Sequence, residues 1–285
     1  MPRKRGTLRT KWLGRTLKDL RDHNEMTLAE VAEYLSRDPS VLSRMENGAL
    51  PIQRPDVGAL LDLYGVNDGA RREAIIRFAE DAWRTDWWDG YAGQVADTMI
   101  DIAWIESQAN SIRSFCATSI DGLLQSSDYA RSVVTAASPD APGDQIDRWV
   151  RLRLMRQAAL GRAEPPEVTV VLDEGVLRRQ VGGPAVMADQ LRHLASQTSR
   201  SHVTIRVLPY AAGAHASPDG SFRLYTLPEP LSEVASVDGP AGLIYLEPPR
   251  TADFIDRYDR LVAAALDPEK SGALIREAAD ILEQS

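Results

Sequence analysis

The stretch between Thr27 and Gly48 constrains the fold more than any other part of this chain, because it is typical of two short helices around a tight turn. Apolar residues recur at helical spacing after Thr27, which is a good N-cap. Asp38 and Pro39 give a second start signal, since a carboxylate caps a helix and proline is tolerated at its first position. Gly48 is a natural stop. The segment therefore predicts a helical hairpin with a short second helix.

The second helix of this hairpin has side chains suited to contact with DNA. Its apolar residues Leu42 and Met45 must face the first helix, where Ala32 is small enough to allow a steep crossing. The outward side chains are short polar groups and one arginine, which suit phosphate oxygens and base edges. We predict base contacts from Ser40, Val41, Ser43 and Arg44. We predict phosphate contacts from Thr27, Asn47, Arg54, Arg3, Lys4, Arg5 and Arg9. A helical hairpin from some other bundle is the alternative.

The charge distribution places the attraction for phosphate at one end of the chain. The formal net charge is −8 over 285 residues, which at first argues against binding to nucleic acid. Residues 1–21, however, hold eight basic side chains and a single acidic one. The first residues are either a solvated tail or an arm that follows the phosphates or enters the minor groove.

Residues 28–48 resemble the helix-turn-helix of the lambda-repressor/Cro (XRE-like) regulators. The small, turn and two apolar positions of that family are occupied by Ala32, Ser36, Leu42 and Met45. Residues 44–48 match the family's closing run. Leu28 stands where the family often has a phosphate-contacting glutamine. Ser36 stands where glycine usually takes a positive φ, and we expect a strain of about 1 kcal/mol there.

We divide the chain into three parts. Residues 1–66 are predicted to form an all-α, five-helix DNA-binding domain with a basic N-terminal arm. Residues 67–100 are expected to be a helical, tryptophan-rich linker. Residues 101–285 are expected to form an α+β domain that binds a ligand or partner and dimerises.

Four large aromatic residues lie close together in the predicted linker. They are Trp83, Trp87, Trp88 and Tyr91. Such a cluster could stack a ligand, but large aromatic side chains are more often buried for their area. We therefore interpret the cluster as a domain junction or a dimer contact.

From about residue 100 the pattern alternates between helices and strands. Strands are predicted over 111–117, 168–172, 203–208, 222–227, 234–237 and 243–246. Helices are predicted over 99–109, 127–137, 145–160, 184–196, 251–265 and 271–283. The last three strands are separated by turns rich in proline and glycine, which is typical of an antiparallel meander. One mixed, largely antiparallel sheet should result.

Several segments of this third part resemble the C-terminal domain of a large set of actinobacterial regulators. These segments are residues 121–131, 153–157, 172–179, 207–209 and 220–222. Such regulators pair an XRE-like helix-turn-helix with a domain of poorly defined role. They are often described as antitoxin-like and are frequently encoded beside a small partner protein. The resemblance implies a DNA-binding transcriptional regulator.

We expect the regulator to act on double-stranded DNA as a homodimer, because one such module reads only a few base pairs and two half-sites raise affinity. A ligand or a small partner protein would control it at the C-terminal domain. The alternative is an antitoxin-like interaction protein that sequesters a small neighbour-encoded partner, with DNA binding as autoregulation.

Other chemistry is weakly indicated. His215 lies in a loop with serine and aspartate residues, but adjacency on one loop does not make a catalytic triad, and we predict no catalytic residue and no enzyme. The histidines lack metal-ligand spacing and Cys116 is the only cysteine, so we predict no metal and no cofactor. Four arginines of the 145–160 helix could bind an anion, although we favour a solvated or salt-bridged face. They are Arg148, Arg151, Arg153 and Arg156.

The sequence gives no sign of membrane insertion. No run of 18 apolar residues is present, and no apolar core follows the charged N-terminus. We therefore expect a cytoplasmic, nucleoid-associated protein.

Overall fold

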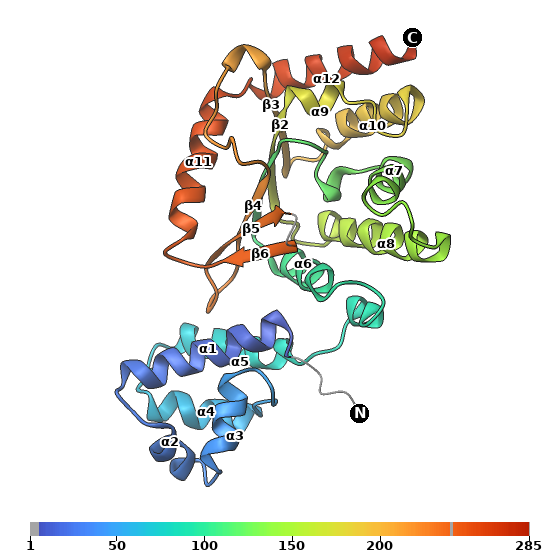
Figure 1. Cartoon of the computed structure of the whole chain (residues 1–285). Coiled ribbons are helices and arrows are strands. Elements are labelled where there is room, and N and C mark those ends of the chain that lie inside the picture. Colours follow the sequence, from blue (N-terminus) through green and yellow to red (C-terminus); the bar gives the residue numbers. More distant parts are fainter. Residues whose placement is uncertain (1–5, 240–241, 285) are drawn as a thin grey trace. The chain divides into compact units, whose positions relative to one another are not determined.

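The computed structural model describes residues 6–239 and 242–284 and divides the chain into two compact units (Figure 1). The first unit takes in the chain up to Ile102 together with Pro228–Leu231. The second takes in Ala103–Leu227 and the chain from Ser232 onward. The first unit is helical and the second contains a mixed six-stranded sheet, which confirms the predicted fold class.

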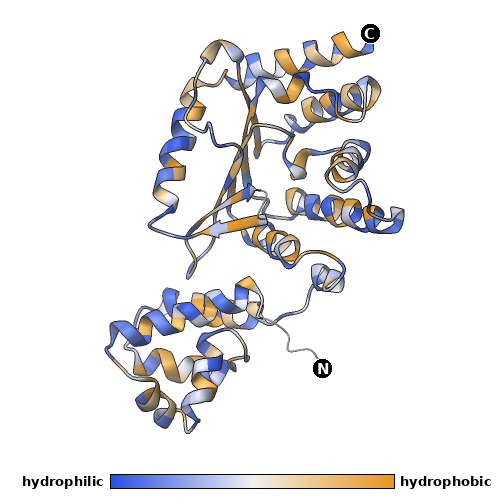
Figure 2. Cartoon of the chain, viewed as in Figure 1, coloured by the Kyte–Doolittle hydropathy of each residue, from blue (hydrophilic) through white to orange (hydrophobic). Residues whose placement is uncertain are grey.

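Five α-helices form the body of the first unit over its described residues. They are α1 (Leu8–His23), α2 (Leu28–Tyr34), α3 (Pro39–Glu46), α4 (Arg54–Leu63) and α5 (Gly69–Ala82). The 3-10 helix η1 (Trp87–Tyr91) and the start of α6 (Asp97–Gln108) follow. Figure 2 shows hydrophilic and hydrophobic residues alternating around these helices, as expected where one side of each helix is buried.

The fifth helix of the first unit lies beyond residue 66, the predicted end of the DNA-binding domain. α5 packs against α1 and α4 and buries Ile75, Phe78 and Ala79. Residues 1–66 would lack this part of the core. The predicted boundary is therefore too early, and the segment interpreted as a linker belongs to the first unit.

The sheet of the second unit has the strand order β3-β2-β1-β4-β5-β6. Its strands are β1 (Ser111–Cys116), β2 (Glu167–Asp173), β3 (Val203–Leu208), β4 (Phe222–Thr226), β5 (Glu233–Gly239) and β6 (Gly242–Leu246). β1, β2 and β3 pair in parallel, and β4, β5 and β6 form the antiparallel meander predicted from the turns. β4 pairs with β1, so the strand order changes direction at β1.

Helices cover both faces of this sheet (Figure 1). They are α7 (Ser127–Ala137), α8 (Gly143–Arg156), α9 (Glu174–Arg178), α10 (Pro184–Gln197), α11 (Thr251–Ala264) and α12 (Pro268–Glu283). α11 covers one face, where Tyr258 and Leu261 pack with Phe115 and Phe222. α7, α8 and α10 lie on the other face (Figure 1).

Three short 3-10 helices complete the second unit as described. They are η2 (Gly122–Leu124), η3 (Gln157–Gly161) and η4 (Tyr210–Ala212). α8 ends at Arg156 rather than at residue 160, and the chain continues as η3. The Gln157 side chain donates to the carbonyls of Gly122 and Gln125 at 3.1 and 2.7 Å, which holds the end of α8 against η2. In the described ranges no helix is long and apolar enough to cross a membrane.

Candidate nucleic-acid interface

α2 and α3 form the predicted hairpin, and each begins at a formed cap. Thr27 accepts the Glu30 N–H at 3.2 Å, while the Glu30 carboxylate accepts the Thr27 N–H at 2.8 Å. At α3, Asp38 accepts the Ser40 N–H at 2.8 Å and Pro39 occupies the first turn. The bonds to Thr27 hold the pKa of Glu30 below its usual value. The bonds to Ser40 lower the pKa of Asp38 in the same way.

The turn between the two helices passes through Ser36, whose φ is 53°. This is the left-handed region that favours glycine, so the predicted strain position is confirmed. The following N–H, of Arg37, donates to the carbonyl of Ala32 at 2.8 Å. Ala32 is fully buried, as expected for the small residue at the crossing.

α3 is fixed against α1 by a close backbone approach that the sequence pattern does not predict. Gly14 of α1 lies so near the end of α3 that a Cβ there would collide with the carbonyl of Glu46. Gly48, with φ 68°, lies equally close to the backbone of Thr10. Helical periodicity does not reveal the role of Gly14, because that role depends on which distant segment the glycine meets.

A buried ion pair strengthens the same contact. Arg21 Nε and Nη2 donate to the Glu46 carboxylate at 2.7 and 3.0 Å, and Nη1 donates to the carbonyl of Met26 at 2.8 Å. Both side chains are more than nine-tenths buried. The hydrogen bond and charge of Glu46 raise the pKa of Arg21, which stays charged. The pair holds the C-terminal end of α3 at a defined angle.

The outward face of α3 carries the residues predicted to contact bases. Ser40 and Arg44 are exposed, and Val41 and Ser43 are partly exposed. Arg37 and Arg54 nearby in sequence are paired with Asp56 and Glu80. Arg44 has no ion-pair partner within the described part of the chain, so its charge is available to an external acceptor.

Three of the predicted phosphate-contacting residues reach the surface but already have partners. The Thr27 hydroxyl donates to Glu30 at 2.7 Å, and Asn47 donates to the Ser43 carbonyl at 2.7 Å. Arg54 pairs with Glu80 at 2.6 Å. Each would exchange an internal bond for one to phosphate. Their role stays a prediction, and Arg3, Lys4 and Arg5 lie outside the described residues.

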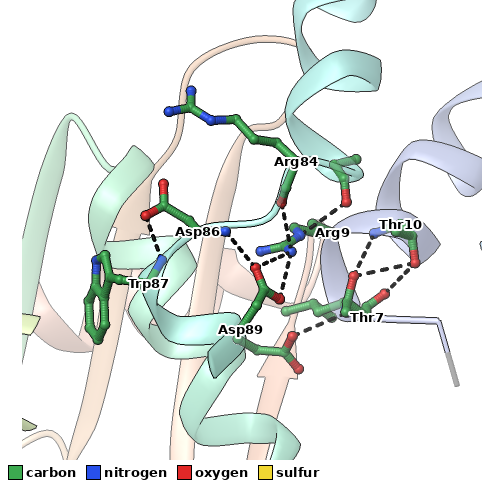
Figure 3. Close-up of polar contacts among 10 residues, drawn as sticks. Thr7, Arg9, Thr10, Arg84, Asp86, Trp87 and Asp89 are labelled. Carbon is green, nitrogen blue, oxygen red and sulfur yellow. Dashed lines mark hydrogen bonds and ion pairs between the residues drawn. The ribbon is translucent and has the colours of Figure 1, made fainter. Parts of the chain in front are cut away.

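The predicted phosphate contact of Arg9 is wrong, because its side chain is buried (Figure 3). Nε donates to the carbonyl of Ala82 at 3.0 Å, and Nη2 donates to the carbonyl of Arg84 at 3.1 Å. Nη2 also pairs with the Asp89 carboxylate at 3.0 Å. The guanidinium therefore ties α1 to the ends of α5 and η1 within the first unit. Counting basic residues along the sequence does not distinguish such an arginine from one on the surface.

The aromatic cluster surrounds η1, which Asp86 caps (Figure 3). Trp88 is buried, and Trp83, Trp87 and Tyr91 are partly buried. Trp87 makes edge contacts with Trp88 at 5.4 Å and with Tyr91 at 6.4 Å between ring centroids. This packing agrees with the general tendency of large aromatic side chains to bury their apolar surface. A junction or dimer role stays a prediction.

The His215 loop does not form a Ser-His-Asp hydrogen-bonded chain. His215 Nδ1 accepts the backbone N–H of Ser217 at 3.2 Å, and the Ser217 hydroxyl donates to the carbonyl of Gly220 at 2.7 Å. Asp219 pairs instead with Arg257 at 3.1 Å. These contacts fix the loop's own shape. The absence of enzymatic activity stays a prediction.

The capped hairpin with its exposed arginine defines the class, a helix-turn-helix protein of the kind found in DNA-binding regulators. Comparison with known families gives a helix-turn-helix domain over residues 12–75 and the domain of unknown function DUF5753 over residues 99–277. The second match covers more than half of the chain, and the protein belongs to the DUF5753 family. No curated protein and no solved structure matches it.

Proposed function

We propose that this protein is a sequence-specific, dimeric transcriptional regulator, controlled by a ligand or partner that binds the second unit. The observation that carries the proposal is the outward face of α3, where Arg44 is exposed and forms no ion pair with any residue that the structure describes, on a helix fixed by Arg21 and Glu46. A rigidly held helix with short polar side chains fits the major groove, and arginine can bind guanine through two hydrogen bonds.

The ends of α3 have different electrostatic roles. Asp38 places a carboxylate at the N-terminus of the helix, so phosphate is disfavoured immediately beside it. Arg44 lies in the last turn and carries the positive charge of the exposed face. Base contacts should therefore centre on Ser43 and Arg44, with Ser40 as a hydroxyl donor or acceptor nearer the N-terminus.

We expect a dimer because a single helix-turn-helix module contacts only a small area of DNA. One recognition helix contacts only a few base pairs, whereas two helices about 34 Å apart read successive major grooves on one side of the duplex. The second unit, with its separate core, would hold two copies together and respond to an effector. Binding of an effector would change DNA affinity only as far as it favours one conformation over another.

The test is selection of bound genomic fragments by the purified full-length protein, followed by affinity measurements on the selected site. Arg44→Ala should weaken binding to that site about 5–150-fold, equivalent to about 1–3 kcal/mol, and relax discrimination at one base position. Arg71→Ala, an exposed arginine on α5, is the matched control and should bind normally.

Two outcomes would contradict this assignment. Equal weakening by Arg44→Ala on selected and random DNA would make Arg44 a phosphate contact only. Failure to select any fragment, together with stable co-purification of the adjacent gene's product, would favour the antitoxin-like alternative. In that case DNA binding would be secondary to sequestration of the small partner.

A further inference from the structure

The four arginines of α8 divide into two pairs with different environments. Arg148 pairs with Asp144 at 2.7 Å on the outer side of the helix, and Arg151 is exposed. These two fit the solvated, salt-bridged face predicted from the sequence. Arg153 and Arg156 do not, because they contact residues in the interior of the second unit.

The interior arginines belong to a group of five charged side chains, which we call the arginine cluster. It consists of Glu106, Asp121, Arg153, Arg156 and Arg223. Arg156 Nε and Nη2 donate to the Glu106 carboxylate at 2.8 and 2.7 Å, and both side chains are almost completely buried. Arg223 Nε donates to Asp121 at 2.7 Å. Two of the three guanidinium groups are thus matched by a carboxylate.

Arg153 is the unmatched member of the arginine cluster. Its Nη1 donates to the neutral amide oxygen of Gln125 at 2.8 Å. Its Nε is buried and has no hydrogen-bond partner among the residues that the structure describes. Burial, together with the charges of Arg156 and Arg223, lowers the pKa of Arg153 to about 10, so the group remains charged at neutral pH. The carboxylates of Asp121 and Asp238 favour this charge without forming an ion pair with it, so a poorly solvated guanidinium of this kind would gain from a directly bound anion.

Hydroxyl groups lie next to the arginine cluster on the same face of the sheet. The strand register places Ser114, Arg223 and Ser236 in one row across β1, β4 and β5. Ser114, Tyr225 and Ser236 are almost completely buried. The Tyr225 hydroxyl lies next to that of Ser236, and the Ser114 hydroxyl lies next to the Cys116 thiol. The neighbourhood therefore gathers buried hydroxyl groups and three guanidinium groups, with Asp121 and Asp238 as the carboxylates that act on Arg153.

The arginine cluster lies where the strand order of the sheet changes direction. Ser114 lies toward the carboxyl end of β1, and Asp121 follows in the loop after that strand. Arg223 lies at the beginning of β4, the antiparallel neighbour of β1. Gly122 closes one side: a Cβ there would lie 3.4 Å from Arg156 Nη2 and 3.9 Å from Arg153 Cγ.

We propose that the arginine cluster binds a small oxyanion, with Arg153 as its principal ligand and the neighbouring hydroxyls as additional donors. The ligand class is a small molecule that carries a carboxylate or phosphate group, because two parallel N–H bonds from a guanidinium match the oxygens of either group. The role of this site as an effector site rests on the proposed function. The binding of an oxyanion to the arginine cluster does not depend on that function.

Binding can be measured on the full-length protein without DNA. Calorimetry and thermal unfolding would compare inorganic phosphate with succinate against chloride at constant ionic strength. We expect at least one of the two to bind with a dissociation constant of about 1 mM or lower and to raise Tm, because the ligand binds only the folded state. The compound that binds more tightly, phosphate or succinate, shows whether the site prefers a phosphate or a carboxylate group.

Variants of α8 separate a ligand from a structural residue. Arg153→Gln should weaken oxyanion binding at least tenfold and raise Tm in anion-free buffer, because it removes a charge without a counter-ion. Arg153→Lys keeps the charge and should retain part of the binding. Arg151→Gln, on the exposed side, should bind as the parent does.

The proposal would be overturned by either of two results: no oxyanion stabilises the protein beyond chloride, or Arg153→Gln binds as tightly as the parent. A fall in Tm for Arg153→Gln without anion would show that Arg153 is needed for folding rather than for a ligand. Since no DNA is present, failure of the regulator assignment would not produce these outcomes.

Discussion

At the scale of single residues, the arginines of this chain show how one side chain takes different roles. Arg44 is exposed without an ion pair in the described structure, whereas Arg21 is buried against Glu46. Arg9 is buried among carbonyl oxygens and Asp89, and Arg153 is partly buried beside a neutral amide. The role of each follows from its partners, because a guanidinium must find acceptors when water is removed.

Ser36 gives a prediction at this scale. Its φ of 53° is a strained conformation for any residue with a Cβ. Ser36→Gly should stabilise the protein by about 0.5–1 kcal/mol, because relief of the strain exceeds the added entropy of the unfolded chain. Differential scanning calorimetry should show a higher Tm for the first unit.

The matched control is Ala29→Gly, an exposed position inside α2. Glycine at this helical position should destabilise the protein by about 1 kcal/mol, because glycine loses more backbone entropy than alanine when a helix forms. A lower Tm for Ser36→Gly would show that the hydroxyl contributes more than the strain costs.

At the scale of elements, local signals located the helices and strands well. The caps at Thr27 and Asp38 mark the starts of α2 and α3, and all six predicted strands occur in the sheet. The short helix α9 was missed because its few residues offer no full period to detect. The place of α5 in the first unit was also missed, since membership of a core depends on packing with distant segments.

The contact between α1 and α3 leads to a prediction about the stability of the protein. Glu46→Gln should destabilise the protein by about 3 kcal/mol, because it removes the buried counter-charge of Arg21 and leaves only the half-exposed Asp22, at 2.7 Å. Urea unfolding followed by circular dichroism measures this loss. Glu33→Gln, on the exposed side of α2, should change stability by less than about 0.5 kcal/mol.

A double variant tests the explanation. Arg21→Met combined with Glu46→Leu should recover most of the stability, since neither partner is then left as a lone buried charge. If Glu46→Gln were as mild as Glu33→Gln, the ion pair would not be what holds α3 in place.

At the scale of the whole molecule, charge is segregated along the chain. The overall charge is −8, yet eight of the first 21 residues are basic. Of these eight, Arg9 and Arg21 are buried and paired, so they do not contribute to an arm on DNA. The electrostatic contribution of the N-terminus must therefore come from Arg3, Lys4 and Arg5, with the exposed Lys11, Arg15 and Lys18 of α1.

Removal of residues 1–5 tests this whole-molecule effect. If all three basic residues contact phosphate, the slope of log K against log salt should fall by about 3, and by about 1 if a single one does. The loss should be the same on selected and random DNA, because phosphate contacts carry no sequence information. Fluorescence anisotropy over a salt series measures the slope, and an unchanged slope would show that the arm makes no contact with DNA.

The sequence by itself determined what depends on neighbours within a few residues: the capped hairpin, the strained turn at Ser36, the outward residues of α3 and the order of helices and strands. Only the tertiary structure decided which charges meet. Arg9 finds Asp89, Arg21 finds Glu46 and Arg156 finds Glu106 across long separations along the chain. Helix caps and periodicity act through adjacent backbone groups, whereas an ion pair depends on how distant segments pack. Packing also gives Arg153 the amide oxygen of Gln125, and no ion pair with a carboxylate of the described residues.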